Sequence, residues 1–104
     1  MQLLHSRWLL AATAAVAFGA APQGATVSIR NFAFEPQTVT VRAGSSVTWT
    51  NLDDEIHTVR GADGLIRSDA LDQNQTYTRK FDRPGTYRYG CSLHSQMGGT
   101  VVVN

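Results

Sequence analysis

The chain has 104 residues, of which 42% are hydrophobic, and its formal net charge is +1. Nine basic residues face eight acidic ones, so the sequence lacks the basic stripe that nucleic-acid binding requires. A single cysteine excludes an internal disulfide. Small secreted domains usually depend on disulfides or on a bound metal for stability. The composition therefore predicts one small domain, no nucleic-acid partner, and a metal as the available source of extra stability.

The N-terminal region has the pattern of a secretory signal. Arg7 precedes an apolar stretch at residues 8–21 that ends in small residues. This stretch is shorter than the roughly 20 residues that a transmembrane helix needs. We predict a signal peptide at residues 1–21, cut within several residues of Gly19, and one mature domain at residues 22–104. No cysteine near the cut offers a lipid anchor, so we expect an exported, soluble protein in the periplasm, without membrane insertion.

The rest of the chain has the pattern of an all-β protein. Short runs rich in Val, Thr, Tyr and Phe recur about every ten residues, and Gly, Pro, Asn and Asp separate them. No helical period of useful length is present. The expected strands are residues 25–30, 38–42, 46–50, 57–60, 75–81, 85–91 and 100–104. The sequence therefore predicts a β-sandwich or barrel, with Trp49, Phe32, Phe34 and Phe81 in its core.

Alternation along the strand at residues 85–91 places Tyr87, Tyr89 and Cys91 on one face. Cys91 should therefore point inward at the end of that strand. After it, Gly98 and Gly99 allow a sharp turn between Met97 and the last strand. We expect the segment from Cys91 to Met97 to be a loop held at both ends by paired strands.

The mature domain keeps one cysteine, two histidines and one methionine: Cys91, His57, His94 and Met97. Together they are a complete ligand set for a mononuclear copper site. Thiolate and thioether suit Cu(I), imidazole suits both oxidation states, and a His2Cys plane with a weak axial Met is typical of electron-transfer copper. Three of the four lie within seven residues, whereas His57 lies 34 positions before Cys91, so the fold must bring them together.

Several motifs carry a resemblance to a known family. They are Phe34-Glu35-Pro36, the run from Val39 to Gly44, Val47 to Asn51, His57-Thr58-Val59, Pro84 to Tyr89, and the Cys-x2-His-x2-Met loop with the Gly-x-Val-Val-Val that follows it. With these motifs the chain resembles the cupredoxins, the small blue copper proteins, and most closely their plastocyanin and amicyanin branch. It departs from the family pattern at Leu93 and Ser95, where Pro is common, and at Thr58, where Asn is common.

The resemblance implies a Greek-key β-sandwich that binds one type 1 copper ion through His57, Cys91, His94 and Met97. His57 and Cys91 would be buried ligands at strand ends, Met97 the long axial ligand, and His94 the exposed edge for electron exchange. It also makes the Thr58 N–H a donor to the Cys91 sulfur, with the Thr58 and Ser92 side chains tying the two ligand loops together. The implied function is one-electron transfer between transient redox partners, by a monomer that is not an enzyme.

Other interpretations remain open at the level of sequence. The main alternative is an exported protein that stores, delivers or senses copper. A cysteine hydrolase and a structural zinc site are weaker, because both histidines belong to one cluster and thioether is not a usual zinc ligand. Gln96 is an alternative axial ligand to Met97. We interpret Asp53, Asp54 and Glu55 as a solvated turn, with partner docking as the alternative role.

Overall fold

The computed structural model describes residues 23–104, so the predicted signal peptide at residues 1–21 lies outside the described residues. The described part contains eight strands and no helix, and therefore no helix long and apolar enough to cross a membrane. The strands are β1 Ala25–Arg30, β2 Ala33–Glu35, β3 Thr38–Val41, β4 Ser45–Asn51, β5 Arg60–Gly61, β6 Thr76–Phe81, β7 Gly85–Gly90 and β8 Gly98–Val103. The all-β class predicted from the sequence is confirmed.

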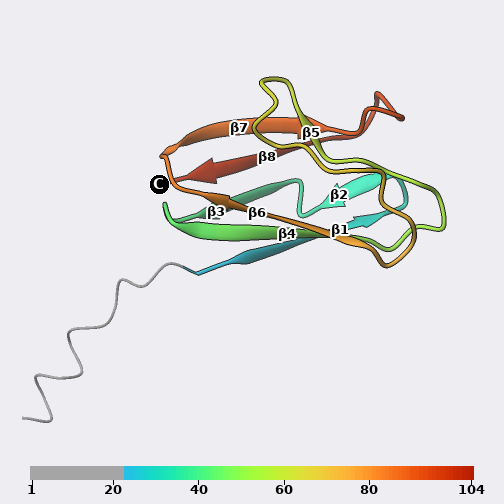
Figure 1. Ribbon diagram of the computed structural model, residues 1–104, viewed down its shortest axis with the longest axis horizontal. Coiled ribbons are helices and arrows are strands. Elements are labelled where there is room, and N and C mark those ends of the chain that lie inside the picture. The colour runs from blue at the N-terminus through green and yellow to red at the C-terminus, as the bar shows by residue number, and fades with distance from the viewer. Residues whose placement is uncertain (1–22) are drawn as a thin grey trace, which may run out of the picture.

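Two four-stranded sheets pack face to face as a sandwich (Figure 1). One has the order β2-β1-β4-β6 and the other β3-β8-β7-β5. Most neighbours are antiparallel, but β1 pairs in parallel with β4, and β3 in parallel with β8. The chain therefore crosses between the sheets before and after β3. In this arrangement the middle of each sheet combines strands that are distant in sequence, which is the Greek-key character that was predicted.

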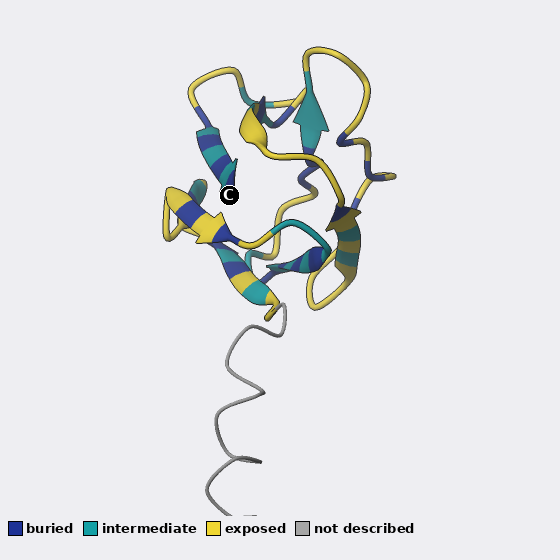
Figure 2. Ribbon diagram, turned by 90° about the vertical axis from the view of Figure 1, so that its left-hand side faces the viewer, coloured by how far each residue is buried: buried dark blue, intermediate teal, exposed yellow. Residues whose placement is uncertain are grey.

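Alternation explains how the sheets form their common core. Every second residue of β4, from Ser45 to Asn51, is buried, and β8 buries Gly99, Val101 and Val103 in the same way. Figure 2 shows this alternation as bands along the strands. Trp49 is fully buried between the sheets, with its ring 5.3 Å from that of Tyr89. Each aromatic or large aliphatic side chain buried in this way contributes about 1.5–3 kcal/mol to folding.

The prediction of a strand at residues 57–60 was largely wrong. Only Arg60 and Gly61 pair as β5, and His57 forms an isolated bridge to Leu71. His57, Thr58 and Val59 are buried in succession, with exposures of 0%, 3% and 0%. A regular strand with one wet face cannot bury three successive side chains, because they point to alternate faces. This segment instead directs its side chains into the core and the site.

Smaller corrections concern the ends of other strands. β2 was not predicted, because three residues are too few to show a pattern, and β8 begins at Gly98, where it pairs with Gly90. Trp49, Phe34 and Phe81 are buried as expected. Phe32 is 38% exposed and lies outside the core, so its expected role was wrong.

Three connections meet at one end of the sandwich. They are the β1–β2 turn, the β4–β5 loop and the β7–β8 loop, which lie together on the right in Figure 1. The C-terminus lies at the opposite end. All the residues of the predicted copper site belong to the β4–β5 and β7–β8 loops, so the topology by itself brings His57 to the Cys91–Met97 segment.

Candidate metal centre

Three metal-binding side chains converge where the β4–β5 and β7–β8 loops meet. His57 Nδ1 lies 3.9 Å from Cys91 Sγ, and His94 Nδ1 lies 3.6 Å from it. Within residues 23–104, the three ligand atoms all fall within 4.8 Å of one another. Met97 is buried at the end of the same loop, and its backbone N–H donates to the His94 carbonyl at 3.1 Å. The structure thus brings together His57, Cys91 and His94, and it buries Met97 at the end of the loop that carries two of them.

Thr58 joins the two loops around the sulfur. Its backbone N–H donates to Cys91 Sγ at 3.4 Å, and its hydroxyl lies 3.7 Å from the same sulfur. The hydroxyl also lies 2.9 Å from Ser92 Oγ and accepts the Ser92 N–H at 2.9 Å. The contacts expected of Thr58 and Ser92 are therefore present, and replacing the family's common Asn by Thr58 leaves the loops connected.

The surroundings of Cys91 favour its ionised form. Burial raises the pKa of the thiol, but hydrogen bonds from the Thr58 N–H, the His94 ring, the Leu93 N–H and the His57 ring together outweigh this effect. They lower the pKa from 9.0 to about 6. The thiolate is the form that binds a metal. The protein part of the site therefore holds a ready ligand at neutral pH.

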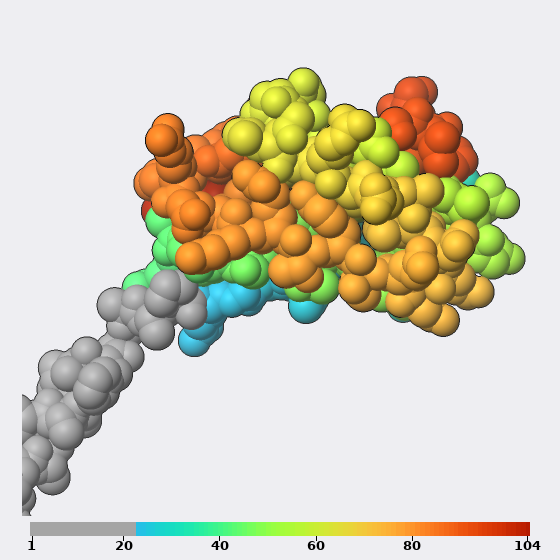
Figure 3. Space-filling model, in the orientation of Figure 1, coloured from blue at the N-terminus to red at the C-terminus, as the bar shows by residue number. Residues whose placement is uncertain are grey.

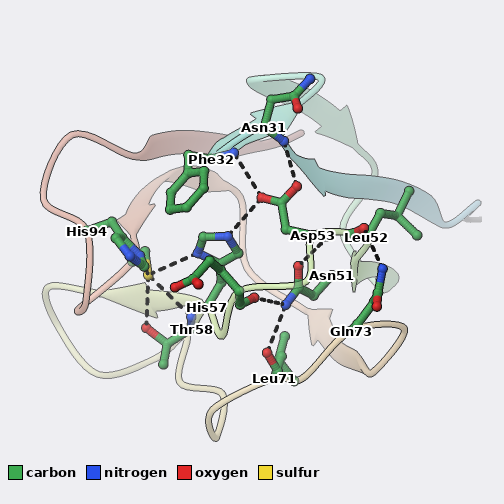
Figure 4. Close-up of polar contacts among 12 residues, drawn as sticks. Asn31, Phe32, Asn51, Leu52, Asp53, His57, Thr58, Leu71, Gln73 and His94 are labelled. Atoms are coloured by element: carbon green, nitrogen blue, oxygen red, sulfur yellow. Dashed lines mark hydrogen bonds and ion pairs between the residues drawn. The ribbon is translucent and has the colours of Figure 1, made fainter.

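His57 is fully buried, and an acidic side chain holds its outer nitrogen. Asp53 Oδ2 lies 2.9 Å from His57 Nε2, while the Asp53 carboxylate also accepts the N–H groups of Asn31 at 2.7 Å and Phe32 at 2.9 Å (Figure 4). Burial raises the pKa of Asp53, but the hydrogen bonds from these two N–H groups and from His57 lower it by more, so the net shift is downward. With Nε2 occupied, Nδ1 is the nitrogen that faces the sulfur.

Asn51 shapes the loop that carries Asp53 and His57. Its side chain has no exposed surface, and its amide group donates to the carbonyls of Glu55 and Leu71, both at 2.8 Å. Its carbonyl oxygen accepts the Asp53 N–H at 2.9 Å. The short-range Asn-x-Asp turn was visible in the sequence. It could have indicated that Asp53 turns inward, whereas Asp54 and Glu55 are exposed as expected.

His94 occupies the outer side of the cluster and is half-buried. Its ring lies 4.9 Å from that of His57 and 4.9 Å from that of Phe32. The β7–β8 loop that carries it projects from the surface at this end of the molecule (Figure 3). The expectation that His94 forms the accessible edge agrees with this position. Phe32, which the sequence placed in the core, instead packs on the site.

The donor set fits copper. One thiolate of low pKa and two imidazoles with Nδ1 facing it, together with the buried methionine of the same loop, form the mixed soft and borderline set that copper prefers in both oxidation states. The carboxylate nearest to the cluster, Asp53, is engaged by the far nitrogen of His57 and by two backbone N–H groups. The protein therefore offers an enclosed site for one ion.

Comparisons with known proteins agree with this geometry. A family model described as a cupredoxin-like domain matches residues 3–103. The chain is 43% identical over 104 residues to amicyanin-alpha of Methylorubrum extorquens, covering 88% of this chain and 87% of that one. It is 41% identical over 83 residues to the chloroplastic plastocyanin of Tetradesmus obliquus, covering 67% and 57%.

Solved structures give the same result. A reduced amicyanin variant matches with a TM-score of 0.74 and 30% identity, covering 78% of this chain and 82% of that one. A purple cupredoxin from Nitrosopumilus maritimus matches with a TM-score of 0.72 and 28% identity, covering 77% and 99%. Both matches cover more than three quarters of this chain. The chain belongs to the cupredoxin family, and within it to the plastocyanin and amicyanin type.

Proposed function

We propose that this protein is a small blue copper protein that carries one electron at a time between redox partners. The observation that supports this most strongly is the convergence of His57, Cys91 and His94, whose ligand atoms lie within 4.8 Å of one another on two cross-linked loops. His57, Cys91 and His94 would hold the ion in its plane, and Met97 would be the axial ligand. Copper bound there supplies a one-electron couple between Cu(II) and Cu(I).

The protein's own residues keep the site rigid and dry. A one-electron carrier works best when the ligand positions suit both oxidation states, so that little has to move. The Thr58 and Ser92 contacts hold the two loops in register, and Asp53 fixes the His57 ring. The burial of His57, Cys91 and Met97 excludes water from the inner side of the site, whereas half-buried His94 leaves a short path to the surface.

The cellular setting is part of the same proposal. We propose export through the signal peptide at residues 1–21, a soluble periplasmic domain at residues 22–104, a monomeric state and transient contacts with redox proteins. The half-buried position of His94 supports brief docking, because electrons can pass through an exposed ligand edge without a permanent complex. In residues 23–104 the cysteine and both histidines lie in one cluster, which supports a metal-based carrier rather than an enzyme that uses these side chains for catalysis.

Optical titration with copper tests the proposal directly. Adding one equivalent of Cu(II) to the metal-free protein should produce an intense visible band, due to charge transfer from the Cys91 thiolate. Cys91→Ala should abolish the band, whereas Ser95→Ala, at an exposed residue of the same loop, should retain it. Stoichiometric copper binding without the band, or a band that survives in Cys91→Ala, would refute the assignment.

A second measurement separates electron carriage from copper delivery. Voltammetry of the loaded protein should show a fast and reversible one-electron couple, with copper retained over many cycles. Loss of copper to a chelator on each reduction would instead favour storage, delivery or sensing of the metal.

A further inference from the structure

The Asp53 carboxylate makes contacts that the proposed ligand set does not explain. One oxygen accepts the Asn31 N–H at 2.7 Å, and the other contacts both the Phe32 N–H and His57 Nε2 at 2.9 Å. The Asp53 side chain is only 11% exposed. Asn31 and Phe32 precede it by more than 20 residues, so the carboxylate connects two separate segments of the site end.

The turn that Asp53 holds has an unusual backbone. Asn31 and Phe32 both have φ in the left-handed region, at 53° and 57°. Residues other than glycine adopt this conformation at a cost of about 1 kcal/mol or more each. Two hydrogen bonds to a charged acceptor offset that cost, because charge-assisted bonds are stronger than neutral ones. The turn therefore depends on Asp53 for its shape.

This shape places the Phe32 ring on the metal centre. The ring lies edge-on to His57 and to His94, with centroids 4.9 Å apart and interplanar angles of 89° in both cases. Figure 4 shows Phe32 beside both imidazoles, with Asp53 on the side of His57 away from His94. Phe32 is 38% exposed, so the core does not account for its position. It covers the outer edge of the histidine pair.

We propose that Asp53 is the positioning residue of this centre: it orients His57 directly and, through the Asn31–Phe32 turn, seats Phe32 against His94. One carboxylate thereby couples the buried histidine to the accessible one. The inference rests on the proposed metal centre, because it assigns Asp53 and Phe32 to the support of its ligands. A carboxylate on the far nitrogen of a ligand histidine also increases the basicity of the ring and fixes which nitrogen faces the metal.

The first test compares Asp53→Ala with Asp54→Ala. The two variants remove the same charge from adjacent residues, but Asp54 is exposed. Competition with a Cu(II) chelator should show that Asp53→Ala lowers Cu(II) affinity about tenfold or more. Asp54→Ala should change it less than twofold. The Cu(II)/Cu(I) equilibrium of Asp53→Ala should also shift toward Cu(I), and Asp53→Asn, whose amide oxygen still accepts hydrogen bonds, should recover part of both effects.

The second test examines the link from Asp53 to Phe32. Phe32→Ala should speed the removal of copper by a chelator severalfold, because His94 loses its neighbour, while the contact from Asp53 to His57 remains. In a double-mutant cycle, the combined Asp53→Ala and Phe32→Ala variant should be less impaired than the product of the single effects. Effects that simply multiply would show that the two residues act independently, and would overturn the coupling.

A measurement on the wild type does not depend on any variant folding. In the NMR spectrum of the Cu(I) protein, the Nε2–H of His57 should exchange slowly with water, and the Phe32 ring should show contacts to His94. Rapid exchange at His57, or equal behaviour of the Asp53 and Asp54 variants, would overturn the inference while leaving the blue band intact. If the wild type lacked that band, the proposed function itself would fail, whereas the Phe32 contacts could still be observed in the metal-free protein.

Discussion

The two histidines of the centre are held in opposite ways. His57 has no exposed surface, and Asp53 holds its outer nitrogen at 2.9 Å. His94 is half-buried, and in the described residues its polar and aromatic side-chain contacts are with Cys91 Sγ at 3.6 Å and with the rings of Phe32 and His57. The β4–β5 side is thus anchored in the fold by polar contacts, whereas the β7–β8 side is a short loop between strand ends. The β4–β5 loop therefore provides rigidity, and the β7–β8 loop provides access from the surface.

The largest expected effect compares His57→Ala with His94→Ala. His57→Ala leaves a buried cavity and an Asp53 carboxylate without its partner. We expect the metal-free protein to lose about 3–5 kcal/mol of unfolding free energy, as for other large-to-small core changes. His94→Ala should cost about 1 kcal/mol or less, because its ring is partly solvated. Urea denaturation of both metal-free variants measures the difference.

Added imidazole makes the same comparison in the loaded proteins. The outer position vacated in His94→Ala is open to solvent, so free imidazole should restore the visible band. The enclosed position of His57 should not be rescued in this way. Equal stability losses in the two variants, or rescue of both by imidazole, would mean that the two sides of the centre are built alike.

The second effect concerns the Cys91 thiol that both sides share. Its pKa is lowered from 9.0 to about 6 in the folded protein. A lowered pKa means that the folded state holds the proton less tightly than the unfolded chain. Its contribution to stability is therefore complete above pH 9, and it is lost as pH falls through about 6. Between these values, this contribution to the metal-free protein should rise with pH, by at most about 1.4 kcal/mol per pH unit.

Thermal or urea unfolding of the metal-free protein across this pH range tests the expectation. Cys91→Ala serves as the control and should lack this part of the slope. The far-ultraviolet absorbance of the thiolate should titrate with a midpoint near 6. A midpoint near the ordinary value of 9.0 would show that the contacts from Thr58 and the histidines do not stabilise the ionised sulfur.

The same contrast explains what the sequence revealed and what it did not. Cys91, His94 and Met97 are neighbours in the chain, so their spacing alone indicated a site. The strands β4, β7 and β8 could be predicted because their alternation records one buried face. His57 joined them as the other histidine of the predicted mature domain, and the resemblance to the cupredoxins supported it. It lies on a loop whose shape depends on distant contacts, so its position could not be predicted from spacing.

The roles of Asp53 and Phe32 depend on contacts between segments far apart in the chain. Asp53 accepts N–H groups from residues 21 and 22 positions away, and no local pattern records such a contact. The run of charges from Asp53 to Glu55 suggested solvent for all three, which was wrong for Asp53. Phe32 was assigned to the core because it is aromatic, although its backbone conformation turns it toward the site. Only the assembled fold distinguishes these residues from their neighbours.

The third prediction tests whether the packing of strands β7 and β8 determines the shape of the loop between them. Gly99 lies opposite Tyr89, and a Cβ at this position would overlap the Tyr89 ring and hydroxyl. Gly99→Ala should therefore displace a buried ring and cost about 1–3 kcal/mol. At the preceding Gly98, a Cβ would meet only the Tyr89 carbonyl oxygen, at 3.8 Å. Gly98→Ala should change stability by less than about 0.5 kcal/mol.

Urea denaturation and the visible spectrum together measure the effects of these two glycine substitutions. If strand packing shapes the loop, Gly99→Ala should also shift the visible band of the copper-loaded protein, because Tyr89 lies two residues before Cys91. An unchanged band with reduced stability would contradict this link, and would show that the Thr58 and Ser92 contacts hold the sulfur without help from the strands.

The smallest expected effect concerns Met97, the one proposed ligand that binds weakly. A soft thioether favours Cu(I), and the amide oxygen of Gln favours Cu(II), so Met97→Gln should lower the reduction potential. The side chains are similar in length and the three strong ligands remain, so the blue colour should persist with an altered spectrum. A tenfold change in the equilibrium of a one-electron couple corresponds to about 59 mV, which voltammetry resolves easily.

Gln96→Ala is the control, because Gln96 is exposed and adjacent to Met97. A Met97→Gln potential equal to that of the wild type, with a shift in Gln96→Ala instead, would transfer the axial role to Gln96. Because the weak axial ligand tunes the couple without holding the ion, this change should alter the potential more than it alters copper affinity.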